Sequence, residues 1–206
     1  MKRPLVLFLF VVAMAAGMIS PGTVFAEPGN SVNLGVGAAS HILPHCKATV
    51  AFVEYEHMLG PKLAVLGRGS GVDYKFDDGN YVEKGRLRGG DIGLRYYPSG
   101  GMKGLFFGGA VGYWKSNWSF TDDKDKTSES QGKGDFKAIR ADLDIGWRFP
   151  IGSSSVSIMP EAHFGKFFKS ASCEYTAPAS LVGTECSKDT EISYYAFLAL
   201  SVGIAF

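Results

Sequence analysis

The sequence predicts an all-β protein, a closed antiparallel up-and-down transmembrane β-barrel of about eight strands. Apolar and polar side chains alternate with a period of two over segments of roughly ten residues. The chain contains 27 glycines and 13% aromatic residues, a composition that favours strands joined by tight turns. Short connections between these segments alternate with mostly longer ones, as expected for a barrel whose two ends meet different surroundings.

The first 26 residues are a predicted secretory signal peptide. Lys2 and Arg3 give a basic start, residues 5–19 form an apolar run, and the segment closes on Val24-Phe25-Ala26. The apolar run is short for a helix that must cross about 30 Å of hydrocarbon. We therefore expect residues 1–26 to be removed on export and residues 27–206 to form one outer-membrane barrel domain.

The charge balance excludes nucleic acid as an expected partner. Without Lys2 and Arg3 the chain keeps 19 of its 21 Lys and Arg residues, against 20 Asp and Glu. A nearly neutral chain has no strong field to attract a polyanion.

Period-two alternation places the expected strands at residues 31–39, 48–59, 62–76, 81–97, 104–120, 136–149, 155–169 and 191–206. In the sixth, Ile139, Leu143 and Ile145 share one face, and Asp142 and Asp144 share the other. Six or ten strands are the alternatives. Pro160 predicts a bulge in the seventh segment, and the glycine-rich third segment has a weak pattern.

The expected connections differ at the two ends. Short turns that contain proline join the second segment to the third, the fourth to the fifth and the sixth to the seventh. At the other end, residues 121–135 are strongly charged and residues 170–189 contain two cysteines, whereas residues 77–80 are a short hairpin-like turn. We expect residues 121–135 to be a mobile external loop.

Aromatic residues gather near both ends of the expected strands, where the interface belts of a membrane barrel lie. The set near the short turns contains Tyr96, Tyr97, Trp147, Phe149 and Phe206. The set near the long connections contains Tyr113, Trp114, Trp118, Phe120, Tyr194 and Tyr195.

The last strand carries a resemblance. The chain ends Ser201-Val202-Gly203-Ile204-Ala205-Phe206, and Ile204 and Phe206 match the C-terminal signal that the outer-membrane barrel-assembly machinery recognises. Ser201 stands where that signal favours glycine. In strand count and loop asymmetry, the mature chain resembles the small eight-stranded barrels of the OmpA transmembrane-domain and OmpX type. The resemblance implies the barrel fold and the bacterial outer membrane as its location, and it carries over no catalytic residue.

If the apolar faces meet lipid, the opposite faces fill the lumen with charges that must pair. The predicted lumen network contains Glu54, Glu56, Asp91, Arg95, Arg140, Asp142, Asp144, Arg148, Glu161 and His163. Because eight strands enclose only enough room for side chains, we interpret this network as a plug. A narrow polar pathway is the alternative, since Gly108, Ala110 and Gly112 are small.

The cysteines predict one cross-link. Cys173 and Cys186 lie in one expected loop, and exported thiols become oxidised, so we expect a disulfide worth about 3 kcal/mol. Cys46 could instead pair with either. His41, His45 and Cys46 offer three ligands where a structural zinc site has four, so neither a metal nor another cofactor is expected.

The outward residues Arg86, Arg88 and Lys115 predict contact with lipopolysaccharide phosphates, although a solvated strand extension explains them equally well. We expect a monomeric, non-enzymatic barrel that acts through its surface loops or through membrane integrity, with an unknown surface ligand. A narrow channel for small or hydrophobic solutes is the alternative. A lipid A-modifying enzyme, using Glu161 and His163, is weaker because His163-Phe164-Gly165 lacks the serine of lipid A deacylases. A soluble lipocalin-like binder would leave Phe206 without a purpose.

Overall fold

The computed structural model describes residues 29–39, 45–122, 130–178, 180–186 and 193–206. The predicted signal peptide, residues 1–26, lies outside the described residues. The described part of the chain contains no helix that could span a lipid bilayer.

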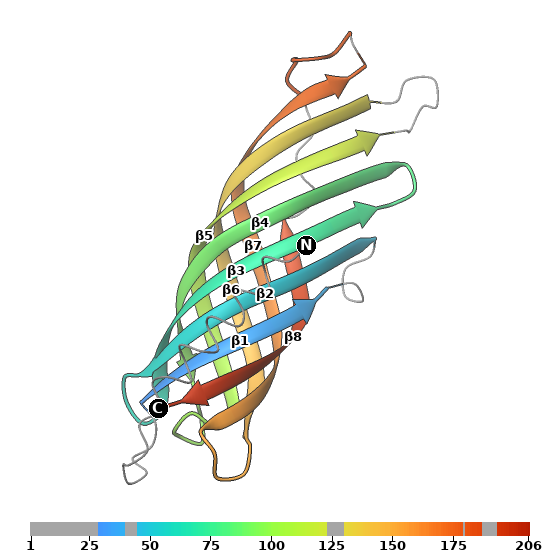
Figure 1. The fold of residues 1–206 in the computed structure, drawn as a ribbon. Coiled ribbons are helices and arrows are strands. Elements are labelled where there is room, and N and C mark those ends of the chain that lie inside the picture. The colour runs from blue at the N-terminus through green and yellow to red at the C-terminus, as the bar shows by residue number, and fades with distance from the viewer. Residues whose placement is uncertain (1–28, 40–44, 123–129, 179, 187–192) are drawn as a thin grey trace.

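Eight antiparallel strands form a closed barrel (Figure 1). They are β1 (Asn30–Ala38), β2 (Cys46–Met58), β3 (Leu63–Asp77), β4 (Tyr81–Tyr96), β5 (Gly104–Asp122), β6 (Ser130–Pro150), β7 (Val156–Ala177) and β8 (Tyr194–Ala205). Each strand pairs with the next, and β1 pairs with β8 to close the ring. The predicted fold class and strand number are confirmed.

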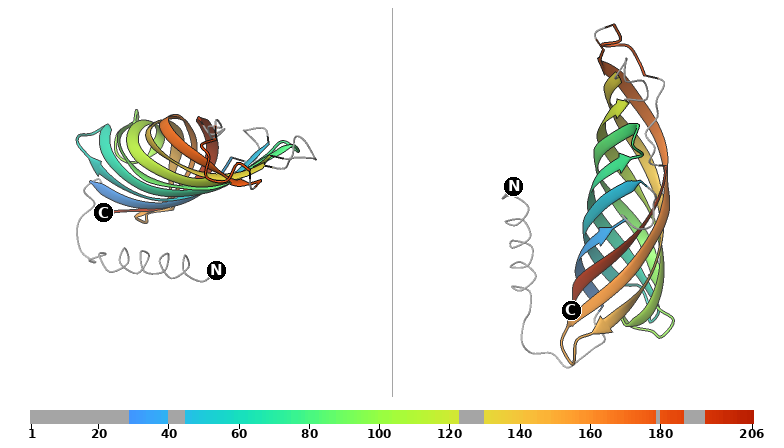
Figure 2. Two further views of the ribbon diagram at one scale, coloured as in Figure 1. Left: turned by 90° about the horizontal axis from the view of Figure 1, so that it is seen from above. Right: turned by 90° about the vertical axis from the view of Figure 1, so that its right-hand side faces the viewer.

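The barrel wall is much taller on one side. β1 has 9 residues, whereas β5, β6 and β7 have 19, 21 and 22. The upper ends of the strands descend from β7 to β1 in Figure 1, and β7 again reaches highest in the right-hand view of Figure 2. A strand needs about 9–11 residues to cross a membrane, so β5 to β7 continue for roughly ten residues beyond it.

The tall wall shortens two connections that were expected at residues 121–135 and 170–189. β5 continues to Asp122 and β6 begins at Ser130, and residues 170–177 belong to β7. The strands continue because their alternation continues. Trp118, Phe120 and Tyr175 still point inward there, against outward polar residues such as Asn117 and Ser119.

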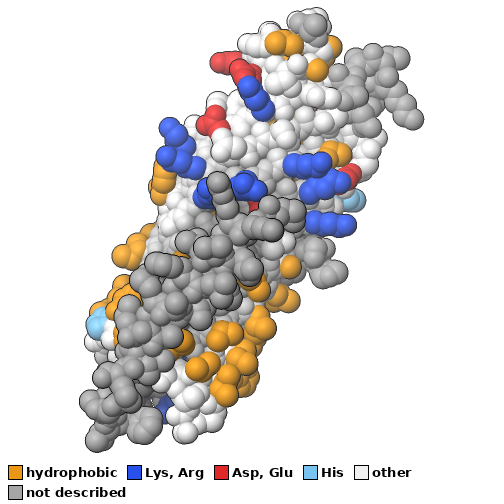
Figure 3. Space-filling view, in the orientation of Figure 1, with side chains coloured by type: hydrophobic (Ala, Val, Ile, Leu, Met, Phe, Trp, Pro, Cys, Tyr) orange, Lys and Arg blue, Asp and Glu red, His pale blue; other side chains and the backbone are white. Residues whose placement is uncertain are grey.

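The distribution of side chains inverts between the two halves of the barrel. In the lower half, at the short-turn end, the interior is charged and the exterior carries exposed apolar residues such as Leu143, Leu198 and Ile92. In the upper half an aromatic core fills the interior. On the face seen in Figure 3, hydrophobic side chains gather in the lower part and Lys and Arg lie above them. The outer surface of the lower half therefore suits contact with lipid, and that of the upper half suits contact with water.

The inversion corrects the predicted upper aromatic belt. Trp114, Trp118 and Phe120 are buried inside the barrel, and Tyr195 joins them from β8. Of that set, Tyr113 and Tyr194 are exposed. In the lower set Tyr97 is also interior, with none of its surface exposed. Consecutive residues of a strand point to opposite faces, so Tyr113 and Trp114 cannot share one belt.

Pro160 does not produce the expected bulge. The register between β6 and β7 is the same at the Gly146–Glu161 and Phe149–Ile158 pairs, and only the ladder between them is interrupted. Pro160 faces outward on β7, so its missing N–H group is accommodated by a local break in pairing. The register shift in this pair of strands lies instead at Gln131 and Gly132.

Glycines face the largest interior side chains across the strands. A Cβ atom on Gly89 would lie 2.4 Å from the ring of Trp114, its register partner. The same relation holds for Gly35 with Phe52, Gly85 with Tyr74, Gly132 with Phe120, Gly134 with Trp118 and Gly146 with Phe106. The high glycine content thus makes room for rings inside a narrow barrel.

Candidate functional site

The lower lumen is closed around the guanidinium group of Arg95, which has no exposed surface. Its nitrogens lie 2.8 Å from a Glu54 oxygen, 2.7 Å from Asp144 and 3.2 Å from Glu161. Glu56 is also within 3.3 Å, and the guanidinium lies over the ring of Phe106 at 4.2 Å. One cation from β4 thus connects β2, β6 and β7 across the lumen.

The ion pairs continue along the lumen above and below Arg95. Arg68 donates to Glu54 at 2.7 Å and to Asp142 at 2.9 Å. Arg140 lies 3.1 Å from Asp142 and 2.9 Å from Asp91, and Arg148 bonds to Glu56. The ten residues predicted for the lumen are all buried and belong to this network. Arg68 also belongs to it, although the sequence pattern did not predict that.

Neutral donors add further hydrogen bonds to the carboxylates of this network. Ser201 donates to Glu161 at 2.6 Å, Tyr97 to Glu56 at 2.7 Å and Tyr195 to Asp142 at 2.6 Å. On β1, Asn33 donates to Glu54 at 3.0 Å, and on β5 the indole N–H of Trp114 donates to Asp91 at 2.9 Å. Every strand of the barrel therefore contributes a hydrogen-bonding or charged group to the network.

Carboxylate groups occupy the space beside two of the small residues of β5. The space beside Gly108 is taken by the Asp144 carboxylate, and the space beside Gly112 is taken by Asp91. A Cβ atom at either glycine would lie 2.1 Å from a carboxylate oxygen. These two glycines make room for the plug itself.

His163 lies inside this network. Its Nδ1 is 3.1 Å from Asp142, its Nε2 is 3.5 Å from Glu161, and its ring stacks on Phe197 at 4.5 Å. The ring has no exposed surface. Its surroundings suit a histidine that completes the ion-pair network, and neither carboxylate beside it reaches the lipid-facing surface.

Comparisons with known proteins bear on the fold. No family model matches the sequence, and no curated protein matches it either. A solved major outer membrane protein from Thermus thermophilus is similar over 86% of this chain and 99% of that chain, with a TM-score of 0.53 and 14% identity. This chain has the outer-membrane β-barrel fold. Its lipid-facing lower half agrees with that fold, and the predicted location in the outer membrane is supported.

Two further solved outer-membrane proteins are similar at lower scores. OprG from Pseudomonas aeruginosa is 12% identical, with a TM-score of 0.46 over 87% of this chain and 97% of that chain. CarO from Acinetobacter baumannii is 11% identical, with a TM-score of 0.44 over 88% of this chain and 100% of that chain.

An apolar cavity lies above the charge network of this outer-membrane barrel. It has a volume of about 40 Å³ and is lined by Val50, Val72, Leu87, Phe167 and Phe197, among others. Arg140 is its one charged lining residue among those described. The cavity is therefore an apolar space that ends on the ion-pair network.

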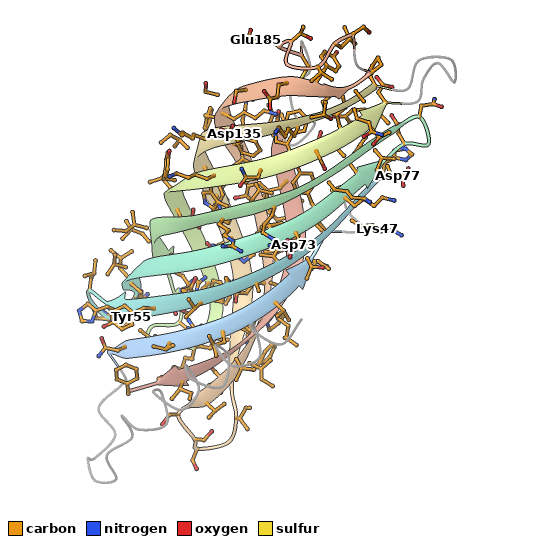
Figure 4. The ribbon with its side chains drawn as sticks, turned by 45° about the horizontal axis from the view of Figure 1, so that its top comes forward. Lys47, Tyr55, Asp73, Asp77, Asp135 and Glu185 are labelled. Carbon is orange, nitrogen blue, oxygen red and sulfur yellow. A yellow bond between two sulfur atoms is a disulfide. The ribbon has the colours of Figure 1, made fainter. Side chains whose placement is uncertain are left out.

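The three cations predicted to contact lipopolysaccharide all point outward at the foot of the upper half. Arg86 donates to Asp73 at 2.5 Å, and this hydrogen bond raises the pKa of the Arg86 guanidinium. Arg88 and Lys115 are register partners on β4 and β5. Figure 4 shows Lys47, Asp73 and Asp77 on the same outer wall, with Tyr55 toward the opposite end.

The predicted disulfide between Cys173 and Cys186 is present, with 5.3 Å between the Cα atoms. It ties the connection after β7 to β7 itself, beside an isolated bridge between Glu174 and Glu185. Cys46 is free and buried, and that burial raises the pKa of its thiol. His41 lies outside the described residues, and the described residues contain no group of three or more His, Cys, Asp or Glu side chains placed to hold a metal ion.

The residues of the predicted assembly signal lie at the seam between the first and last strands. Ile204 pairs with Val32, and the backbone of Phe206 exchanges hydrogen bonds with Asn30 at 2.9 and 3.0 Å. The side chain of Phe206 is 47% exposed at the short-turn end.

Proposed function

We propose that this protein is a closed, non-conducting outer-membrane barrel that catalyses no reaction and acts at the cell surface through its tall β5–β7 wall. The plug around Arg95 is the observation that carries the first part. Four carboxylates surround one guanidinium with no exposed surface, and the network extends over the cross-section of the lumen. The interior of an eight-stranded barrel is only about wide enough for its own side chains, so such a network fills it.

The upper wall supports the second part of the proposal. Its aromatic core and the Cys173–Cys186 disulfide make it a rigid extension of the barrel rather than a set of loose loops. Binding residues concentrate on structures that a rigid scaffold holds outside the membrane. Its polar outer surface suits contact with another hydrated surface, such as that of a neighbouring cell.

Conductance in planar lipid bilayers tests the closed lumen. We expect no resolvable current from the native barrel, and current from a variant with Arg95→Ser and Glu54→Ser, which removes the centre of the plug. Lys62→Gln, at an exposed site near a short turn, is the matched control and should stay silent. Resolvable single-channel steps from the native barrel would refute the closed lumen.

A shortened barrel tests the surface role. Residues 117–135 are replaced by a two-residue Asn-Gly turn between Ser116 and Phe136, which are register partners on β5 and β6. Cells with the shortened barrel should aggregate and attach to polystyrene less than cells with the native one. Equal attachment, together with greater detergent sensitivity of the cells, would instead indicate a role in membrane integrity.

A path for small hydrophobic solutes is the second candidate, and the apolar cavity favours it. Such a solute would enter between Leu87, Phe167 and Phe197 and stop at Arg140. The fluorescent probe N-phenyl-1-naphthylamine should then bind the purified barrel, and Val72→Trp, which fills the cavity, should abolish binding. Equal binding by the native and filled barrels would remove this candidate.

A further inference from the structure

The outer wall of the barrel carries cations that lie directly opposite one another. Arg88, Lys115 and Lys137 are successive register partners on β4, β5 and β6, and all three point outward and are exposed. We call them the basic row. Neighbouring strands lie about 4.8 Å apart, so the three Cα atoms fit within roughly 10 Å. Like charges placed directly opposite destabilise a sheet, so this arrangement calls for an anion.

The basic row has no carboxylate within ion-pair distance among the described residues. None of its three cations forms an ion pair with a described Asp or Glu, whereas the nearby Arg86 is paired with Asp73. The row ends at residues without charge, since Arg88 pairs with Gly71 on β3 and Lys137 pairs with Ser170 on β7. The charges are thus concentrated on one side of the barrel.

The level of the basic row relates it to the membrane. Below it on the same outward faces lie Ile92, Tyr113 and Ile139, which are 64%, 48% and 54% exposed. Above it lie Arg86, Asn117 and Asp135. The row therefore stands at the change from apolar to polar surface, where lipid headgroups meet a membrane protein.

A second row of cations lies above the first. Lys47, Lys75 and Lys84 are register partners on β2, β3 and β4. An open hollow in the wall at Gly85 lies beside this row, lined by Lys75, Lys84, Arg86, Asn117 and Ser119, together with Asp73. A ligand that carries several phosphates on a sugar framework can contact the basic row with one phosphate and this hollow with another.

We propose that the outward face of β3 to β6 binds the phosphorylated sugar headgroup of lipopolysaccharide, with Arg88, Lys115 and Lys137 as the ligands of the phosphate closest to the membrane. Arginine and lysine are the residues that bind phosphate, arginine with two parallel hydrogen bonds and lysine as a point charge. The apolar residues beneath the row would contact the acyl chains of the same lipid. Bound lipid would offset the repulsion among the three cations and fix the height of the barrel in the membrane.

The test compares purified barrels in detergent micelles by isothermal titration with lipopolysaccharide. The variant Lys115→Gln/Lys137→Gln should bind about 30-fold more weakly than the native barrel, since each cation near an anionic surface contributes about fivefold in affinity. The control Lys62→Gln/Lys103→Gln removes two exposed charges at the short-turn end and should bind as the native barrel does. The heat-dependent shift on a gel verifies that each barrel is folded.

Two ligand arms identify the source of the phosphate, and they use the native barrel alone. Lipopolysaccharide from which the phosphates have been removed should bind at least tenfold more weakly than the intact lipid. Inorganic phosphate should not compete at millimolar concentration. Equal binding of the dephosphorylated lipid would overturn the proposal, as would unchanged binding by the Lys115→Gln/Lys137→Gln variant. Competition by inorganic phosphate would indicate that the site binds a free anion instead of the lipid.

Discussion

Replacing Arg95 with alanine tests whether the plug stabilises the barrel as its geometry indicates. The substitution leaves Glu54, Glu56, Asp144 and Glu161 buried without the cation that they share. Removing one partner of a buried ion pair costs about 3–5 kcal/mol, so we expect about 4 kcal/mol, roughly a thousandfold in the folding equilibrium. The contact between Arg95 and Phe106 is lost as well.

The measurement is unfolding by urea in lipid vesicles, followed by tryptophan fluorescence. Arg86→Ala is the control, because the Arg86–Asp73 pair is 61% and 68% exposed and ion pairs screened by solvent contribute little to stability. Adding Asp144→Asn to Arg95→Ala should recover part of the stability, since one unpaired charge is removed with it. A loss below about 1 kcal/mol for Arg95→Ala would refute the assignment of a stabilising plug.

Three further predictions concern the packing of glycines, the state of the cysteines and the assembly of the barrel. Gly89→Ala should destabilise the barrel by about 1–3 kcal/mol in the same urea assay, because its Cβ would meet the Trp114 ring, whereas Gly67→Ala, with open space around it, should stay near the native value. A thiol reagent should modify no cysteine of the folded barrel, one after unfolding and all three after unfolding with reduction, since Cys46 is buried with a raised pKa and the other two are linked. Modification of the folded barrel would contradict the burial of Cys46. Phe206→Ala should lower the amount of barrel in the outer membrane while the refolded variant keeps its urea midpoint; unchanged membrane levels would count against an assembly signal.

The alternation in the sequence was sufficient for the number and order of the strands, although not for their full lengths, because burial on one face obliges side chains to repeat every second residue. It also placed Asp142 and Asp144 opposite Leu143 and Ile145, and the structure shows the same division. Arg68 was missed because glycines flank it, and glycines give no apolar or polar signal on their own face. Its even spacing from Ala64 and Leu66, which are both interior, was the available clue.

The level of the inversion could not be obtained from alternation. A period of two separates an apolar face of the strand from a polar one. It does not say whether the apolar face points into the barrel or toward its surroundings. Strand β5 shows both arrangements. Below the inversion its Phe107 and Val111 face outward, and above it Trp118 and Phe120 face the interior of the barrel. An adjacency rule would have helped, because Tyr194 and Tyr195 are neighbours and must point in opposite directions.

The ladder that joins the first strand to the last is the shortest line of hydrogen bonds in the wall. It runs only from Ser31 to Ala38 on β1, whereas the ladder between β5 and β6 runs from Gly104 to Asp122. The start of β1 and the C-terminal residue lie on this line, where the backbones of Asn30 and Phe206 exchange hydrogen bonds. The junction between β1 and β8 therefore has the fewest backbone pairs in the wall. We expect this junction to separate first when the folded protein is pulled open, because fewer hydrogen bonds must break there.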